Sequence, residues 1–175
     1  MTENSIREEI EKLCSHIKVI MDEIEKLEKT DILTSRKCEN KIVEALRQYR
    51  PLGNINFIVS HEEIEKEAKA IKMQSNNNKK IVSSIKKKIA IFDTNTLCGH
   101  ISYCMKILTE LEINDIALSR KFARKIMNTL MEYSFFKTIN FSMIEENLLE
   151  DMQTLYMQEQ AKLTLSKGDN NVKEK

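Results

Sequence analysis

The stretch IREEIEKLCSHIKVIMDEIEKL (residues 6–27) decides the fold class, because its apolar residues recur at alternating steps of four and three. This spacing places them along one side of an α-helix. Glu8 with Lys12, and Asp22 with Lys26, are spaced for i, i+4 ion pairs on other faces. We predict a helix over about residues 3–29. Its assembly face consists of Ile6, Ile10, Leu13, Ile17, Ile20, Ile24 and Leu27.

This apolar stripe is narrow, which is typical of a coiled-coil seam rather than of the wide buried face of a globular helix. About three heptads are marginal for a free coiled coil, so the helix needs a partner or tertiary packing. Two interpretations stay open. The stripe pairs with another chain, as a homo- or hetero-oligomer through this first helix, or it folds back on its own chain.

The sequence between this helix and residue 80 predicts two more helices and one strand. A helix over about 35–49 ends at Pro51 and Gly53, and the capping box Ser60–Glu63 opens another helix to about residue 73. Residues 55–59 form the one strand candidate, and they have no obvious partner strand. The polar run at residues 74–80 reads as a linker.

The second half predicts four further helices. The first ends near Phe92, and Asp93-Thr94-Asn95-Thr96 supplies cap residues for the next. A third follows Asp115, and the capping box Ser142–Glu145 opens the last. The predicted fold is all-α, with N-terminal coiled-coil-like helices followed by a four-helix bundle. Its domains are an N-terminal helical region at 1–74, a helical bundle at 75–165 and a disordered tail at 166–175.

The amino-acid composition argues against several classes of protein. Only 3 Gly and 1 Pro are present, which argues against β-sandwiches and glycine-rich nucleotide-binding folds. No secretory signal or membrane-length apolar run is visible, so we expect an intracellular protein without a membrane partner. The four cysteines are then expected to be free, buried thiols.

Motifs for catalysis are absent from the sequence. There is no phosphate loop, no His-Glu-x-x-His and no nucleophile elbow, and His16, His61 and His100 lie in separate segments. Only His100 and Cys104 have an i, i+4 spacing suited to shared metal ligation. We expect no enzyme, no cofactor and no metal site.

The middle of the chain is basic. Residues 76–140 carry 11 Lys or Arg against 5 Asp or Glu, in runs at 79–88 and 120–125. Such runs suit phosphate contact or nuclear import, although aromatic residues are not interleaved as in single-strand binders. We favour a solvated basic face over nucleic-acid binding, and a nuclear over a cytoplasmic location.

Three short stretches carry a family resemblance. They are Tyr103–Leu111 (YCMKILTEL), the pair Thr129-Leu130 followed by Phe136-Lys137, and Met143 to Tyr156. With these, residues 81–160 resemble the helical bundle of the transcription factor TFIIS N-terminal domain and the LEDGF-type integrase-binding domain.

The resemblance implies a site for partner peptides. In the integrase-binding type, disordered peptide motifs dock on two interhelical loops. Carried over to this chain, the partner-binding residues are Phe92, Asp93, Phe136 and Thr138. The function expected is a non-enzymatic protein-protein interaction module, in one form a transcription or chromatin adaptor that binds short peptide motifs. The alternative is a structural subunit of a larger helical assembly (kinetochore, cytoskeletal or trafficking) held through the N-terminal coiled coil.

Overall fold

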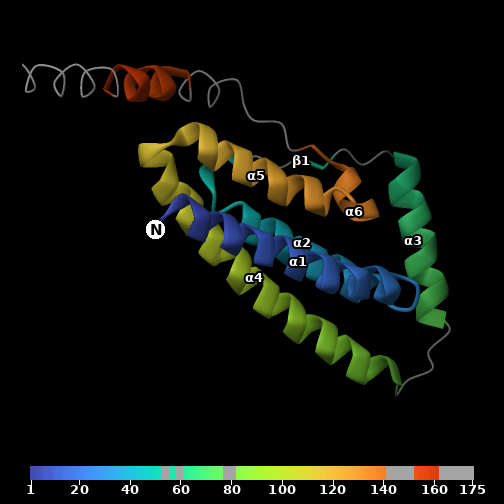
Figure 1. The fold of residues 1–175 in the computed structure, drawn as a ribbon. Helices are drawn as coiled ribbons and strands as arrows, with labels where there is room; N and C mark the ends of the chain where they lie inside the picture. The colour runs from blue at the N-terminus through green and yellow to red at the C-terminus, as the bar shows by residue number, and fades with distance from the viewer. Residues whose placement is uncertain (53–55, 58–60, 77–81, 141–151, 162–175) are drawn as a thin grey trace, which may run out of the picture.

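The computed structural model describes residues 1–52, 56–57, 61–76, 82–140 and 152–161, and it is an all-α fold (Figure 1). Residues 152–161 are helical as well. The predicted capping box at 142–145 and the predicted tail at 166–175 lie outside the described residues. The elements are α1 (Glu3–Glu28), α2 (Ile32–Leu46), a 3-10 turn (Arg50–Leu52), β1 (Asn56–Phe57), α3 (His61–Asn76), α4 (Val82–Asn114), α5 (Ile116–Leu130), α6 (Ser134–Lys137) and β2 (Ile139–Asn140).

The core lies among four helices taken from both halves of the chain. α1 packs against α2, α4 and α5, and α4 also packs against α2 and α5. In Figure 1 α1 runs through the middle of the molecule, between α5 and α4. A separate N-terminal domain at 1–74 was therefore the wrong division, because its helices share one hydrophobic core with the second half.

The predicted assembly face of α1 is buried inside the chain. All seven of its residues lie in the core, and Ile10, Leu13 and Ile17 have no exposed surface. Of the two interpretations, the stripe folds back on its own chain. The prediction of an oligomer through this face is therefore corrected, because the face already packs against α2, α4 and α5 of the same chain.

The predicted break at Asp93 does not occur, because α4 is continuous through it. The cap-type threonines bond within the helix instead. The Thr94 hydroxyl donates to the Ala90 carbonyl at 2.6 Å and the Thr96 hydroxyl donates to the Phe92 carbonyl at 3.2 Å. Threonine that bonds to the preceding turn is compatible with a helix interior, so these residues do not mark a start.

The strand candidate has a partner after all. β1 pairs antiparallel with β2, with Asn56 opposite Asn140 and Phe57 opposite Ile139. Each strand is two residues long, so this pairing is a tie between the two halves rather than a sheet that organises the core.

The two halves of the chain are copies of one unit. Residues 13–57 and 97–141 align without a gap at an offset of 84, and 19 of the 45 pairs are identical. The likeness is clearest between LEKTDILTSRKCENKI (27–42) and LEINDIALSRKFARKI (111–126). Sequence reasoning that read each helix separately missed this repeat.

Equivalent side chains make equivalent contacts in the two copies. Asp31 and Asp115 cap α2 and α5 by accepting from Thr34 N–H and Leu118 N–H, both at 3.0 Å. The Ser35 hydroxyl donates to a carbonyl of α1 and the Ser119 hydroxyl donates to one of α4. Further matched pairs are Arg36–Glu28 with Arg120–Glu112, and Gln74–Ile32 with Gln158–Ile116.

Contacts between the copies are reciprocal, which is the signature of a two-fold axis. Lys41 of α2 donates to Asn95 of α4 at 2.8 Å, and its equivalent Lys125 of α5 donates to Glu11 of α1 at 2.7 Å. Here Glu11 is the equivalent of Asn95. The chain therefore folds as an internal pseudo-dimer of two helical hairpins.

Candidate protein-docking surface

Comparing the two copies of the repeat distinguishes residues that the fold requires from residues that it does not require. Where two equivalent positions have the same surroundings but different side chains, the difference is not needed for packing. Leu52 and Phe136 are equivalent and both are buried, so an apolar residue there belongs to the core. The informative positions are those where one copy is apolar and exposed and the other is polar.

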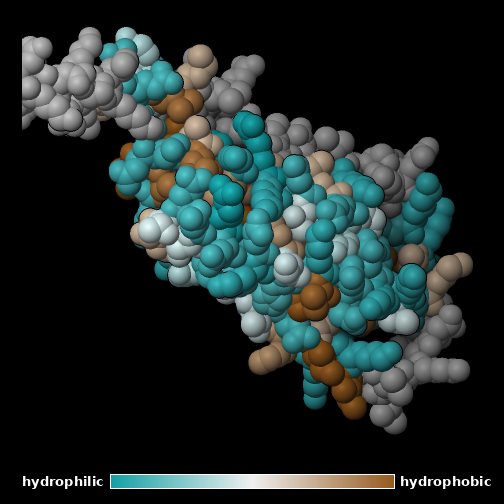
Figure 2. Space-filling model, in the orientation of Figure 1, coloured by the Kyte–Doolittle hydropathy of each residue, from teal (hydrophilic) through white to brown (hydrophobic). Residues whose placement is uncertain are grey.

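One face of α4 is such a place. Ile85, Ile89, Phe92 and Tyr103 are 64%, 54%, 70% and 49% exposed, with Thr96 and Gly99 exposed between them. Steps of four and three put all six residues on one side of the helix, over about 27 Å at 1.5 Å per residue. We call these residues the α4 stripe. Figure 2 shows hydrophobic side chains at the exposed lower end of this face, over the N-terminal part of α4.

The equivalent face of α1 is mostly polar. The residues at the equivalent positions, in order, are Met1, Ser5, Glu8, Lys12, Ser15 and Val19. Because Ser5 and Glu8 stand where α4 has Ile89 and Phe92, the hairpin does not need apolar residues there. The α4 stripe is thus an addition to one copy.

A hollow of about 260 Å³ lies beside the stripe, between the C-terminal end of α1 and the N-terminal half of α4. Ile89 belongs both to the stripe and to this hollow, so the two surfaces are continuous. The lining is part apolar and part charged: Glu23, Lys26, Leu27, Thr30, Lys86, Ile89, Ala90 and Asp93.

The charges around the stripe are mainly positive. Lys86, Lys88 and Lys106 are exposed, and within the part of the chain that the structure describes none of them forms an ion pair. Lys87 differs, since it lies 3.3 Å from the Asp31 carboxylate. The flanks of the stripe thus carry cations that remain available to a partner.

The structure places the four predicted partner-binding residues in different surroundings. Phe92 is exposed on the stripe and Asp93 lines the hollow beside it. Phe136 has no exposed surface, and the Thr138 hydroxyl donates to the Phe135 carbonyl at 2.6 Å. The predicted site is corrected in this respect: Phe136 fills the core and is not an anchor for a peptide, whereas Phe92 and Asp93 adjoin an open surface.

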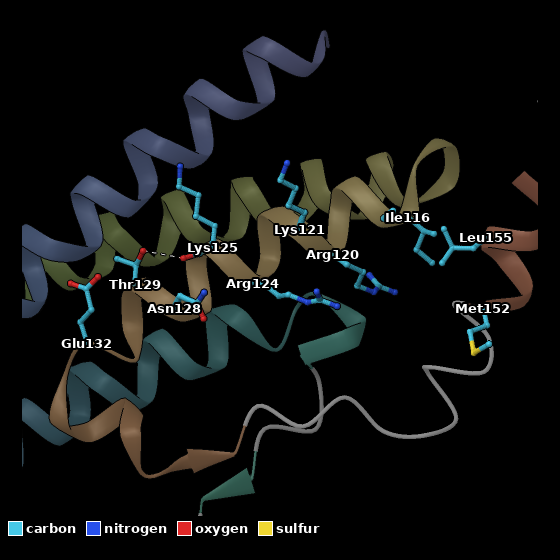
Figure 3. A pocket seen from close by; sticks show the side chains of 11 residues that line it. Ile116, Arg120, Lys121, Arg124, Lys125, Asn128, Thr129, Glu132, Met152 and Leu155 are labelled. Atoms are coloured by element: carbon cyan, nitrogen blue, oxygen red, sulfur yellow. Dashed lines mark hydrogen bonds between the residues drawn. The ribbon is translucent and has the colours of Figure 1, made fainter. Parts of the chain in front are cut away.

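A second, larger hollow of about 570 Å³ lies along the basic face of α5 (Figure 3). Figure 3 shows Arg120, Lys121, Arg124 and Lys125 along this helix, with Met152 and Leu155 from the helix at 152–161. Two of the four cations form ion pairs with other helices of the chain or with the end of α4. Arg120 pairs with Glu112 at 2.5 Å and Lys125 with Glu11 at 2.7 Å. The predicted basic face is thus partly structural.

Two of the histidines meet at the pseudo-two-fold axis, which the sequence reading did not predict. The Nδ1 atoms of His16 and His100 are 3.2 Å apart, and the two rings come from α1 and α4. Within the described residues no group of three or more histidine, cysteine or acidic side chains is arranged to hold a metal ion. The signal that could have paired these histidines was their separation of 84 residues, the repeat offset.

The cysteines are free, as expected, and three of the four are buried. Burial raises the pKa of the Cys104 thiol to about 12 and also raises the pKa of Cys38 and Cys98. A raised pKa disfavours the thiolate, the nucleophilic form. These cysteines therefore act as packing residues.

The helix α2 carries a buried acid, Glu39. Glu39 is packed against Arg36, which bonds Glu39, Glu28 and Glu67 at 2.5 to 2.7 Å. Burial raises the pKa of Glu39 to about 7, against the opposing effect of Arg36. Only 1% of its side chain is exposed, so no substrate can reach it, and its equivalent in the second copy is Ala123.

Comparison of the chain with protein-family models, curated proteins and solved structures gave no match. Within the described residues, no helix is both long enough and apolar enough to span a bilayer.

Proposed function

We propose that this protein is a non-enzymatic protein-protein interaction module that docks a partner along the α4 stripe. The observation that carries the proposal is the difference between the copies. α4 exposes Ile89 and Phe92 where α1 carries Ser5 and Glu8 on the same scaffold. Exposed apolar groups gathered on one face are typical of interaction sites.

The energetics favour a covered stripe. Burying a large apolar side chain contributes about 1.5–3 kcal/mol relative to leaving it in water. Ile85, Ile89, Phe92 and Tyr103 lie on one face and would be covered together by one partner. An aromatic residue among them supplies a rigid anchor of the kind enriched at binding hot spots.

A transcription or chromatin adaptor is one form of this module, as the TFIIS and LEDGF resemblance suggests. Docking through Phe92 and Asp93 would use two of the four partner-binding residues that the resemblance implies, while Phe136 packs in the core. A subunit of a larger helical assembly is the second form. The heptad-like spacing of the stripe favours it, with contact made through α4 in place of α1.

Quantitative capture of the tagged chain from its source cells tests the proposal. The test variant is Phe92→Glu, which gives α4 the residue that α1 carries at Glu8. The matched control is Ile113→Lys, at a residue that is 76% exposed near the end of α4 and whose equivalent is Lys29. Both variants should keep the wild-type circular dichroism spectrum.

We expect Phe92→Glu to lose the specific partner and Ile113→Lys to retain it. Equal recovery of the same partners by both variants would place docking elsewhere and overturn the proposal. A catalytic turnover that survives in Phe92→Glu would overturn the non-enzymatic part.

A further inference from the structure

The geometry points to the occupant of the α4 stripe: an amphipathic α-helix of a partner protein, with an apolar seam and acidic residues on its flanks. This inference rests on the proposed function and adds the conformation and charge of the partner. Three observations carry it, namely the spacing of the stripe, the opening at Gly99 and the sign of the flanking charges.

The spacing favours a helix over an extended peptide. Ile85, Ile89, Phe92, Thr96, Gly99 and Tyr103 follow the order four, three, four, three, four. That is the a/d pattern in which one helix accepts the side chains of another along its length. An extended peptide would instead use an exposed sheet edge or a short pocket. About 27 Å of stripe matches a helix of about five turns.

Gly99 keeps the middle of the stripe open. A Cβ atom placed on Gly99 would meet nothing within 4 Å. Among the residues that the structure describes, no side chain therefore fills the space directly above Gly99. Small residues at a helix surface let a second backbone approach closely. The flanking anchors are Phe92, about two turns before the close approach, and Tyr103, about one turn after it.

The flanks determine the charge of the partner. On the helical wheel Lys88 and Lys106 lie along one side of the stripe and Lys86 along the other. Two acidic residues, Asp93 and Glu23, line the hollow beside Leu27, and Glu23 is already paired with Lys26 at 2.7 Å. Charged flanking positions set partner choice in paired helices, so glutamate or aspartate at the facing positions is the complementary choice.

The same charges disfavour a second copy of this chain as the occupant. Two α4 stripes placed face to face would bring Lys86, Lys88 and Lys106 of one chain toward the same residues of the other. Like charges across an interface suppress pairing. A hetero-partner with acidic flanks satisfies both the apolar seam and the lysines.

Fluorescence anisotropy with synthetic peptides and the full chain tests the inference. The probe is a three-heptad peptide with leucine at the seam positions and glutamate at the flanks. Its matched control has the same seam and length, with lysine at the flanks. Both peptides are measured against the wild type, Phe92→Glu, and the double variant Lys88→Glu with Lys106→Glu, at low and high salt.

We expect the glutamate-flanked probe to bind the wild type about tenfold or more tightly than the lysine-flanked one, with a difference that shrinks in high salt. Phe92→Glu should weaken binding of the acidic probe by about tenfold or more. The double charge reversal should invert the preference. Equal binding of the two probes, or a preference for lysine, would overturn the inference.

Two further results separate this inference from the proposed function. If neither probe binds while Phe92→Glu still loses its partner in cells, the acidic helix is wrong and the docking surface stands. If Phe92→Glu loses no partner, both fall. Analytical ultracentrifugation covers self-association: a wild-type dimer that Phe92→Glu dissociates would identify a second copy as the occupant and overturn the inference.

Discussion

The Nδ1 atom of His16 lies 3.2 Å from the Nδ1 atom of His100, and these two residues are equivalent positions of the internal repeat. A residue on a two-fold axis contacts its own counterpart, so this pair marks the point where α1 and α4 cross. At this separation one ring must donate and the other accept, and the pair is therefore satisfied when at least one imidazole is neutral.

This contact predicts a pH dependence. Burial, reinforced by His16, lowers the pKa of His100 below 6.5, with Glu9 opposing and Lys12 adding to the effect. Because the folded state favours neutral His100, its contribution to stability is present above pH 6.5 and is lost as the pH falls below it. The change is at most about 1.4 kcal/mol per pH unit. Urea unfolding of wild type and His100→Gln at pH 7.5 and pH 5.5 measures it.

The difference between wild type and variant is the relevant quantity. We expect wild type to lose more stability than His100→Gln on acidification. If His100→Gln loses as much stability as wild type on acidification, protonation of His100 beside His16 does not destabilise the fold.

Glu39 predicts the opposite trend. Its pKa in the folded state is about 7, above its ordinary 4.5, so the folded state favours the protonated acid. Its contribution is therefore fully present below pH 4.5 and is lost as the pH rises through 7. We expect Glu39→Gln to be neutral or stabilising by about 1 kcal/mol at pH 8, since Arg36 keeps Glu28 and Glu67.

Chemical denaturation at pH 5 and pH 8 checks this, with Glu28→Gln as the more exposed control. A loss of more than about 2 kcal/mol at pH 8 for Glu39→Gln would mean that the charged pair with Arg36 stabilises the fold.

Gln74 and Gln158 predict matched local effects. The Gln74 side chain accepts from Ile32 N–H at 2.7 Å and donates to the Glu28 carbonyl at 3.0 Å, so it ties α3 to the α1–α2 turn. Gln158 makes the same two bonds to Ile116 and Glu112, at 3.3 and 3.1 Å. We expect Gln74→Ala to cost about 1–2 kcal/mol, and Gln158→Ala less because its bonds are longer.

Hydrogen exchange locates the change. Faster exchange in α3 for Gln74→Ala, and in residues 152–161 for Gln158→Ala, is the expected pattern. Uniform loss of protection across α1 would contradict a local tie.

The repeat predicts that the stripe can be removed without harm to the fold. The variant Ile85→Met, Ile89→Ser, Phe92→Glu gives α4 the residues found at the equivalent positions 1, 5 and 8 of the first copy. Since these positions are exposed, we expect the free energy of unfolding to change by less than about 1 kcal/mol. Thermal melting followed by circular dichroism measures it. A collapse of the melting transition would show that the stripe packs within the chain.

Several features were predictable from sequence for clear physical reasons. The apolar residues of α1 from Ile6 to Leu27 recur with a long, regular period. That period predicted a buried helix face, although it did not determine which helices cover it. Asp115 correctly marked the start of α5, because its side chain accepts from Leu118 N–H. Asp93 failed as a helix start because the adjacent threonines bond back to α4.

The periodicity of the apolar residues alone could not reveal the docking surface. Phe136 and Phe92 are both aromatic residues next to predicted helix ends, and nothing local says that the first is buried and the second exposed. The repeat does say so: Phe136 is equivalent to Leu52 and Phe92 to Glu8. Aligning the halves before assigning helices would have separated the core aromatic from the surface one.

Titration calorimetry with the purified partner is the most direct test of the α4 stripe. It compares the wild type, Ile113→Lys and the variant Ile85→Met, Ile89→Ser, Phe92→Glu, each with an unchanged fold. We predict wild-type affinity for Ile113→Lys and a loss of about a hundredfold, equivalent to about 2.7 kcal/mol, for the triple variant. Equal affinity of all three chains would contradict docking on α4.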